Sequence, residues 1–171
     1  YTLTSSNVTA NSATTFDITL NAVDKLHING ILNQNGNTAV SGTTFNLAAA
    51  TNWNASRTSS ADLTSNPITV SNVSAPSITS ATYSNTTGIL TVIGTDFTAT
   101  EGVKNDVIAS KFTFKGEGGV TYTLTNTPNV EIASATTFTL IVSATDRAAI
   151  NMIANKIGLT SIDGFFYILS A

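Results

Sequence analysis

The chain carries one segment twice and the segment between the two copies only once. Residues 1–49 and 122–171 align with one inserted residue near Pro128, and 22 of 49 positions are then identical. Phe16 aligns with Phe138 and Asp24 with Asp146. The repeat period is about 122 residues, so 171 residues hold about 1.4 periods. This pattern is typical of an excerpt from a tandem array or of a subunit that polymerises.

Composition indicates a folded β protein with a neutral polar surface. Apolar residues make up 42% of the chain and charged residues only 10%, while Thr supplies 31 residues and Ser and Asn supply 18 each. Thr favours strands, whereas Ser and Asn favour turns. The net charge is −3 and the seven basic residues are scattered. We therefore expect no nucleic-acid partner and, without an apolar run near the roughly 20 residues that span a bilayer, no membrane insertion.

Short alternating segments separated by Gly, Asn, Ser and Pro predict a mainly β fold of Ig-like antiparallel β-sandwich modules. Each module is expected to hold one short helix, at about 24–34 and 146–156, because Asn21 and Ser143 stand three residues before an acid in a capping pattern. The expected strands are 15–21, 43–48, 68–73, 78–83, 89–93, 111–115, 121–125, 137–143 and 165–170.

The boundary between modules is expected near residues 73–76, where Ala75-Pro76 favours an extended chain and opens a new strand. Residues 1–74 are then the C-terminal part of one repeat unit, and residues 75–171 are most of the following unit. Absence of Cys excludes disulfides and thiol chemistry, and it fits an exterior location as well as many cytosolic proteins.

Several stretches resemble a known kind of repeat. They are PSITSATYSN (76–85), GILTVIGTDF (88–97), NDVIASKFTF (105–114), GEGGVTYTL (116–124) and NGNTAVSGTTFNLAAATNWN (35–54). Together they resemble the tandem Ig-like β-sandwich repeats of giant bacterial surface and secreted proteins, which are adhesin-like. The resemblance implies an exported, multi-copy module that serves in adhesion, cell-surface layers or extracellular filaments.

Few residues are candidates for chemistry. His27 is the only histidine and aligns with Ala149, so a catalytic triad or a His-based metal site is not expected. The loop after residue 95 gathers oxygen ligands of the kind that Ca²⁺ prefers, although ordinary turn chemistry is the other reading. Trp53 is expected in the core, or as a contact for a sugar ring. The four candidate Ca²⁺ ligands are Asp96, Glu101, Asn105 and Asp106.

The two copies must share a single complementary half, residues 76–121. If that half closes a sandwich with the second copy, the first copy exposes strand edges that can pair with another chain. Three arrangements follow: the chain is part of a longer array, neighbouring protomers supply the missing strands, or each copy closes its own small sandwich with parts of 50–121.

We therefore expect a non-enzymatic extracellular or cell-surface module. Its expected work is to space or assemble a bacterial surface array or filament, with neighbouring repeats or identical protomers as partners. The alternative is a carbohydrate- or calcium-binding β-sandwich module that uses loop 96–106 or Trp53 and contacts surface glycans.

Overall fold

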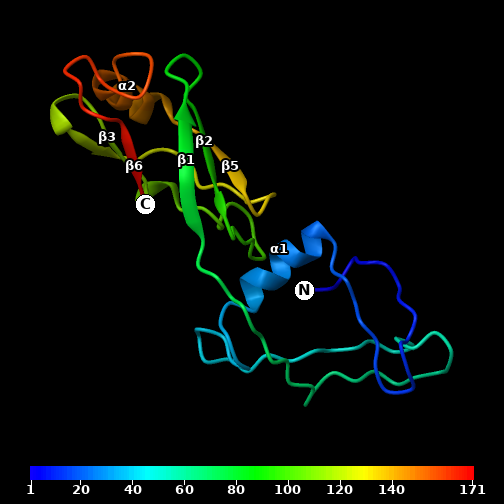
Figure 1. Ribbon diagram of the computed structural model, residues 1–171. Helices are drawn as coiled ribbons and strands as arrows, with labels where there is room; N and C mark the ends of the chain where they lie inside the picture. Colours follow the sequence, from blue (N-terminus) through cyan, green and yellow to red (C-terminus); the bar gives the residue numbers. More distant parts are fainter. The chain divides into compact units, whose positions relative to one another are not determined.

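The computed structural model describes all residues, Tyr1–Ala171, and the chain divides into two compact units, Tyr1–Ala75 and Pro76–Ala171. Each unit holds one copy of the repeated segment. Two antiparallel three-stranded sheets and two α-helices make up the regular structure, which confirms the mainly β prediction (Figure 1).

The unit Pro76–Ala171 contains both sheets. The first has the order β1-β2-β5, with β1 at Ser77–Tyr83, β2 at Ile89–Thr95 and β5 at Thr137–Ile141. The second has the order β4-β3-β6, with β3 at Thr113–Lys115, β4 at Thr121–Thr123 and β6 at Ile168–Ser170. Short 3-10 turns η1 and η2 lie at Ala109–Lys111 and Glu117–Gly119. Both sheets therefore join strands of the single half to strands of the second copy.

The core of this unit follows from side-chain alternation. Buried and exposed residues alternate along β2 and β5, which is the pattern of strands with one covered face. Phe138 of β5 stands edge-on to Phe97 and Phe112, with ring centroids 5.1 and 5.9 Å apart. The largest fully buried apolar side chains are Leu90, Val92, Leu124, Leu140 and Ile150.

A tight turn joins β1 to β2. Gly88 has a φ of 72° and its amide donates to the carbonyl of Ser84 at 2.7 Å. A residue with a side chain rarely adopts this conformation.

The two helices occupy equivalent positions in the two copies. Helix α1 is Ala22–Ile31 and helix α2 is Ala144–Ile153, with Asn21 and Ser143 as the N-caps. Both begin two residues before the expected start and end three residues before the expected end. The caps explain the start, because the helical conformation begins directly after a side chain that accepts from the amide of the acid three residues on.

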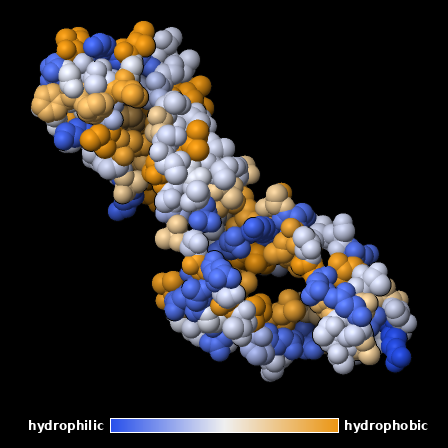
Figure 2. Space-filling model, viewed as in Figure 1, coloured by the Kyte–Doolittle hydropathy of each residue, from blue (hydrophilic) through white to orange (hydrophobic).

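The unit Tyr1–Ala75 has helix α1 but no strand, so the prediction of strands at 15–21, 43–48 and 68–73 is wrong. Only isolated antiparallel bridges occur here, among them Gly36 with Val70 and Asn46 with Pro67. Its buried apolar side chains are Leu26 and Phe45 alone. Figure 2 shows this unit hollowed, with apolar surface bordering the opening. Without a paired strand and a second sheet, the segment has no surface on which to close a core.

Candidate functional site

A buried carboxylate organises the second copy. Asp146 is fully buried at the start of α2 and accepts hydrogen bonds from the chain that enters the copy. The hydroxyl of Tyr122 donates to Oδ1 at 2.8 Å, and the hydroxyl and amide of Thr127 donate to Oδ2 at 2.6 and 2.7 Å. Thr125 and Asn126 add amide donors at 3.2 and 3.0 Å. The carboxylate therefore ties β4 to the helix.

Asp24 does the same in the first copy. It is fully buried, and its Oδ1 accepts from the hydroxyl of Tyr1 at 2.7 Å and from that of Thr4 at 2.8 Å. The amide of Ser5 donates to Oδ2 at 2.7 Å, and the Ser5 hydroxyl also donates to it. Each unit thus has one such buried carboxylate, Asp24 in the first copy and Asp146 in the second, and we call these two residues the anchors.

The anchors also locate the inserted residue. The Ser5 hydroxyl accepts from the amide of the N-cap Asn21 at 3.0 Å, and the Thr127 hydroxyl accepts from that of Ser143 at 3.1 Å. Ser5 and Thr127 are therefore equivalent, and Asn126 is the extra residue of the second copy. Sequence alignment alone placed the insertion only approximately, near Pro128.

Both anchor carboxylates are held in the ionised form. Burial pushes the pKa of Asp146 up, but hydrogen bonds from Thr127 and Tyr122 outweigh it and hold that pKa well below the usual range. Burial also pushes the pKa of Asp24 up, but hydrogen bonds from Ser5 and Tyr1 outweigh it and hold that pKa well below its usual range. A carboxylate surrounded by donors favours its charged form, because protonation would place a proton against them.

The hairpin after each helix is a second shared feature. Thr38 bridges Thr44 in the first copy, and Thr160 bridges Phe166 in the second. The amides of Gly42 and Gly164, both at positive φ, close the turns at 2.8 and 3.1 Å. Local structure is therefore alike in the two copies on both sides of the helix.

The copies differ where the second copy pairs with the single half. Phe138 is 7% exposed and Leu140 is 0% exposed, because β5 pairs with β2 and turns these side chains inward. Their counterparts Phe16 and Ile18 are 44% and 42% exposed. The first copy thus presents, as open surface, residues that the second copy buries.

The helix stripe shows the same difference. Ile150 and Ile153 of α2 are buried. In α1, Ile28 is half-buried and Ile31 is 40% exposed. The apolar face of α1 therefore lacks the cover that α2 has.

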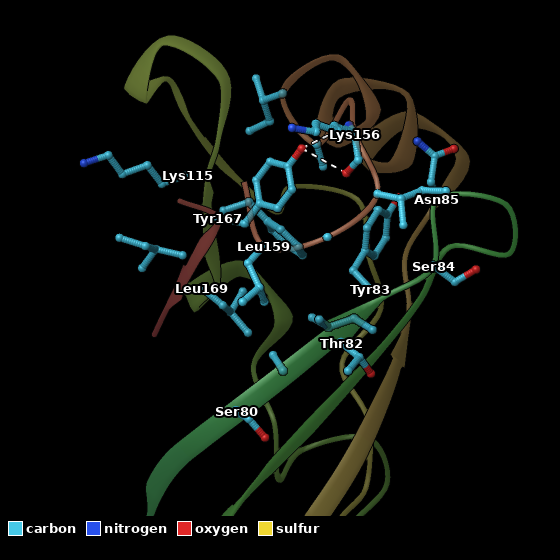
Figure 3. A pocket seen from close by; sticks show the side chains of 18 of the residues that line it. Ser80, Thr82, Tyr83, Ser84, Asn85, Lys115, Lys156, Leu159, Tyr167 and Leu169 are labelled. Atoms are coloured by element: carbon cyan, nitrogen blue, oxygen red, sulfur yellow. Dashed lines mark hydrogen bonds between the residues drawn. The ribbon is translucent and has the colours of Figure 1, made fainter. Parts of the chain in front are cut away.

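An open groove of about 900 Å³ lies within the unit Pro76–Ala171. One wall is β1 and the other is β6 with the segment that follows α2 (Figure 3). Tyr83 and Tyr167 both border the groove, and the Tyr167 hydroxyl donates to the carbonyl of Lys156 at 3.2 Å. Its lining is mixed apolar and hydroxylic, including Leu90, Phe114, Ile157, Leu159 and Leu169.

The predicted calcium ligands do not meet in one cluster. Asp106 uses Oδ1 to accept from the amide and hydroxyl of Thr100 at 2.7 and 3.0 Å, and Oδ2 to accept from the amide of Ile132 at 2.8 Å. The side-chain amide of Asn105 donates to the carbonyl of Glu101 at 2.9 Å. Asp96 is exposed, with a φ of 57°.

Asp106 therefore acts as a staple between loop 100–106 and residue 132. No group of three His, Cys, Asp or Glu side chains in the chain is placed to hold a metal ion. Calcium binding at Asp96, Glu101, Asn105 and Asp106 stays a prediction.

The first unit holds two pairs of neighbouring ring side chains. Trp53 is 50% exposed and lies 6.2 Å from the Phe16 ring, so it is not the core residue that its size predicted. His27 stacks on Tyr1, with ring centroids 4.8 Å apart and planes at 18°. Its buried Nδ1 has no hydrogen-bond partner. Ala149 stands at the equivalent place, so this stack belongs to the first copy only.

The sequence alone does not identify the donors around Asp24 and Asp146 as a site. Their signal was present, since the YTLT run that opens each copy supplies the tyrosine and threonine donors.

Comparisons with protein-family models, curated proteins and solved structures found no match for the chain. No helix has the length and apolar character needed to cross a bilayer.

Proposed function

We propose that the chain is a non-enzymatic structural or adhesive repeat module of an extracellular bacterial surface array or filament. Its work is to space or assemble that array by joining successive half-units into Ig-like sandwiches. The extracellular setting is supported by the Thr-, Ser- and Asn-rich composition and by the resemblance to surface-protein repeats.

One observation carries the proposal: Phe16 and Ile18 are exposed while their counterparts Phe138 and Leu140 are buried. Burial of a large apolar side chain stabilises a fold by about 1.5–3 kcal/mol. A half-unit that leaves two such positions open is therefore stabilised by any surface that covers them. In the second copy the single half provides this surface, since Phe97 and Phe112 stand edge-on to Phe138 and β2 pairs with β5.

The Ig-like architecture is supported by pairing across the duplicated and single halves. Each three-stranded sheet of the second unit needs both halves, because β5 of the second copy completes the β1–β2 pair and β6 of the second copy pairs with β3. In this proposal a sandwich closes when strands of one half-unit pair with strands of the other. A half-unit that offers open strand positions can accept the same strands from a neighbour, as in donor-strand complementation.

Two sources of the covering half are compatible with this function. It is supplied by the preceding repeat of a longer chain, or by residues 76–121 of another protomer. In the second case the contact is head-to-tail and propagates into an open filament. Both sources give a mechanical module whose strength lies in shared β-sheets.

The test is to place a second copy of residues 76–121 ahead of Tyr1 in an otherwise intact chain. We expect the amides of residues 15–19 to become protected from hydrogen exchange, as we also expect for β5, and the self-association that pairing between protomers would cause to cease. Light scattering over a dilution series reports the association. A control extension with the same residues in scrambled order should leave residues 15–19 unprotected.

If the true extension leaves residues 15–19 as exposed as the scrambled one does, the two copies do not share one complement and the proposal fails.

A further inference from the structure

The groove in the unit Pro76–Ala171 lies between two sheet edges. In the strand orders β1-β2-β5 and β4-β3-β6, both β1 and β6 are edge strands. Every residue of β1 is exposed except Tyr83, which is half-buried. An open edge with an uncovered face is a place where a further strand can add.

The first unit shows what lies at the equivalent place. There, residues 62–70 run antiparallel to the segment that corresponds to β6. The amide of Leu47 donates to the carbonyl of Asn66 at 2.9 Å, and Ala49 and Asp62 exchange two backbone hydrogen bonds at 2.7 and 2.8 Å. Gly36 and Val70 exchange two more, at 2.9 and 2.7 Å.

Three residues of this contact, Gly36, Leu47 and Asn46, which bridges Pro67, have counterparts at the groove. Shifting by the repeat carries Gly36 to Gly158, Asn46 to Ile168 and Leu47 to Leu169. All three counterparts line the groove. The wall that holds residues 62–70 in the first unit is therefore the wall that stands open in the second.

Strand β6 has two edges, and each edge can pair with a different strand. In the sheet, β6 pairs with β3 on one side, with Leu169 opposite Phe114. In the first unit the corresponding segment uses its Leu47 and Ala49 groups toward residues 62–66. Adjacent strands lie on opposite sides of a strand, so β3 and a strand of the 62–70 kind can flank β6 together.

The side chains of that strand also suit the groove. Ile68 and Val70 are half-buried in the first unit and alternate with exposed Thr69. In a strand they share one face. At the groove, such a face would meet the apolar side chains of Leu90, Phe114 and Leu159.

We propose that the groove between β1 and β6 binds a β-strand with the sequence character of residues 62–73, supplied by the following repeat period after Ala171. This inference rests on the proposed tandem-repeat function and names the segment that completes the second sheet. The sheet then has four strands, and one strand enters each sandwich from the period that follows.

The test extends the full chain by residues 50–75, placed after Ala171 as they stand after Ala49. The chain has no native cysteine, so a disulfide can report the register. Asn46 and Pro67 form a bridge whose neighbours carry the hydrogen bonds, an arrangement that brings paired Cα atoms close. Ile168→Cys is therefore combined with Pro67→Cys of the appended copy.

Two variants serve as controls. Asn46→Cys with the original Pro67→Cys should cross-link, because that pair is formed in the first unit. Ile168→Cys with Ser71→Cys of the appended copy is out of register and should stay reduced. A second measurement without cysteines follows the Leu169 amide by hydrogen exchange, which should slow at least about tenfold in the extended chain.

An intramolecular disulfide at Ile168 together with the slower Leu169 amide supports the proposal. A reduced Ile168 variant beside a cross-linked Asn46 control overturns it. An intermolecular disulfide overturns it as well, since a second copy would then supply the strand. Protection of residues 15–19 by the added 76–121 half is a separate result, so the groove proposal can fail while the repeat function stands.

Discussion

The hydroxyl of Tyr122 donates a 2.8 Å hydrogen bond to Oδ1 of Asp146, across the 24 residues that separate the start of the second copy from its helix. Tyr1 and Asp24 repeat the contact at 2.7 Å in the first copy. The anchor holds the incoming strand on the helix N-terminus without help from the single half. Each copy therefore carries its own local organiser, and only the sheets depend on a partner.

Replacing the carboxylate of the second anchor should destabilise the unit Pro76–Ala171. Asp146→Asn keeps the shape but turns a donor group toward the Thr127 or Tyr122 donors, which leaves buried hydrogen-bonding groups unpaired. We expect a loss of about 2–3 kcal/mol in the free energy of unfolding, measured by urea denaturation. Asp96→Asn is the matched control, because Asp96 is exposed and asparagine tolerates its positive φ. Equal effects of the two substitutions would contradict the anchor role.

Acid should weaken both units through the same carboxylates. The folded-state pKa values of Asp24 and Asp146 are lowered, so the stability they contribute is present above the unfolded pKa of about 3.9 and is lost as the pH falls toward the folded values. We expect the urea midpoint to fall progressively below about pH 5. Asp146→Asn should flatten that fall for the second unit. A midpoint that rises on acidification would contradict this.

Equivalent core truncations should differ between the copies. Leu140→Ala removes a fully buried side chain and should cost about 2–5 kcal/mol. Ile18→Ala changes a side chain that is 42% exposed and should cost less than about 1 kcal/mol. Denaturation of both variants, followed by a probe in each unit, gives the comparison. Similar costs at the two positions would mean that the first copy is already closed.

Calcium should have little effect on the melting temperature of the second unit. Both carboxylate oxygens of Asp106 already accept from protein donors, and binding an ion would require those hydrogen bonds to break. Scanning calorimetry with and without Ca²⁺ measures this. A clear rise in melting temperature that Glu101→Gln abolishes would instead establish the calcium site predicted from the sequence.

The sequence predicts local structure well, but it does not predict which segments pair with one another. Capping residues predict both helices and alternation predicts β5, because each of these signals lies within a few residues. Residues 15–21 have the same alternating pattern as β5 but form no strand. A strand needs a neighbour, and the pattern within one segment does not say whether that neighbour exists.

The anchors were hidden for a different reason. The capping pattern marks Asp24 and Asp146 in the sequence. The residues that donate most of their hydrogen bonds lie about 20 residues earlier in the chain. Only the fold brings these donors to the helix. The YTLT run is identical in the two copies, but the structure is needed to show that it supplies hydrogen-bond donors to these carboxylates.

Hydrogen exchange on the unmodified chain, at a dilution where light scattering shows a monomer, tests the central claim most directly. Residues 15–19 and 137–141 are compared in the same sample, since they are equivalent positions of one repeated segment. We predict strong protection over 137–141 and exchange at least about 100-fold faster over 15–19. Equal protection of the two segments in the monomer would contradict the account, because the first copy would then need no partner.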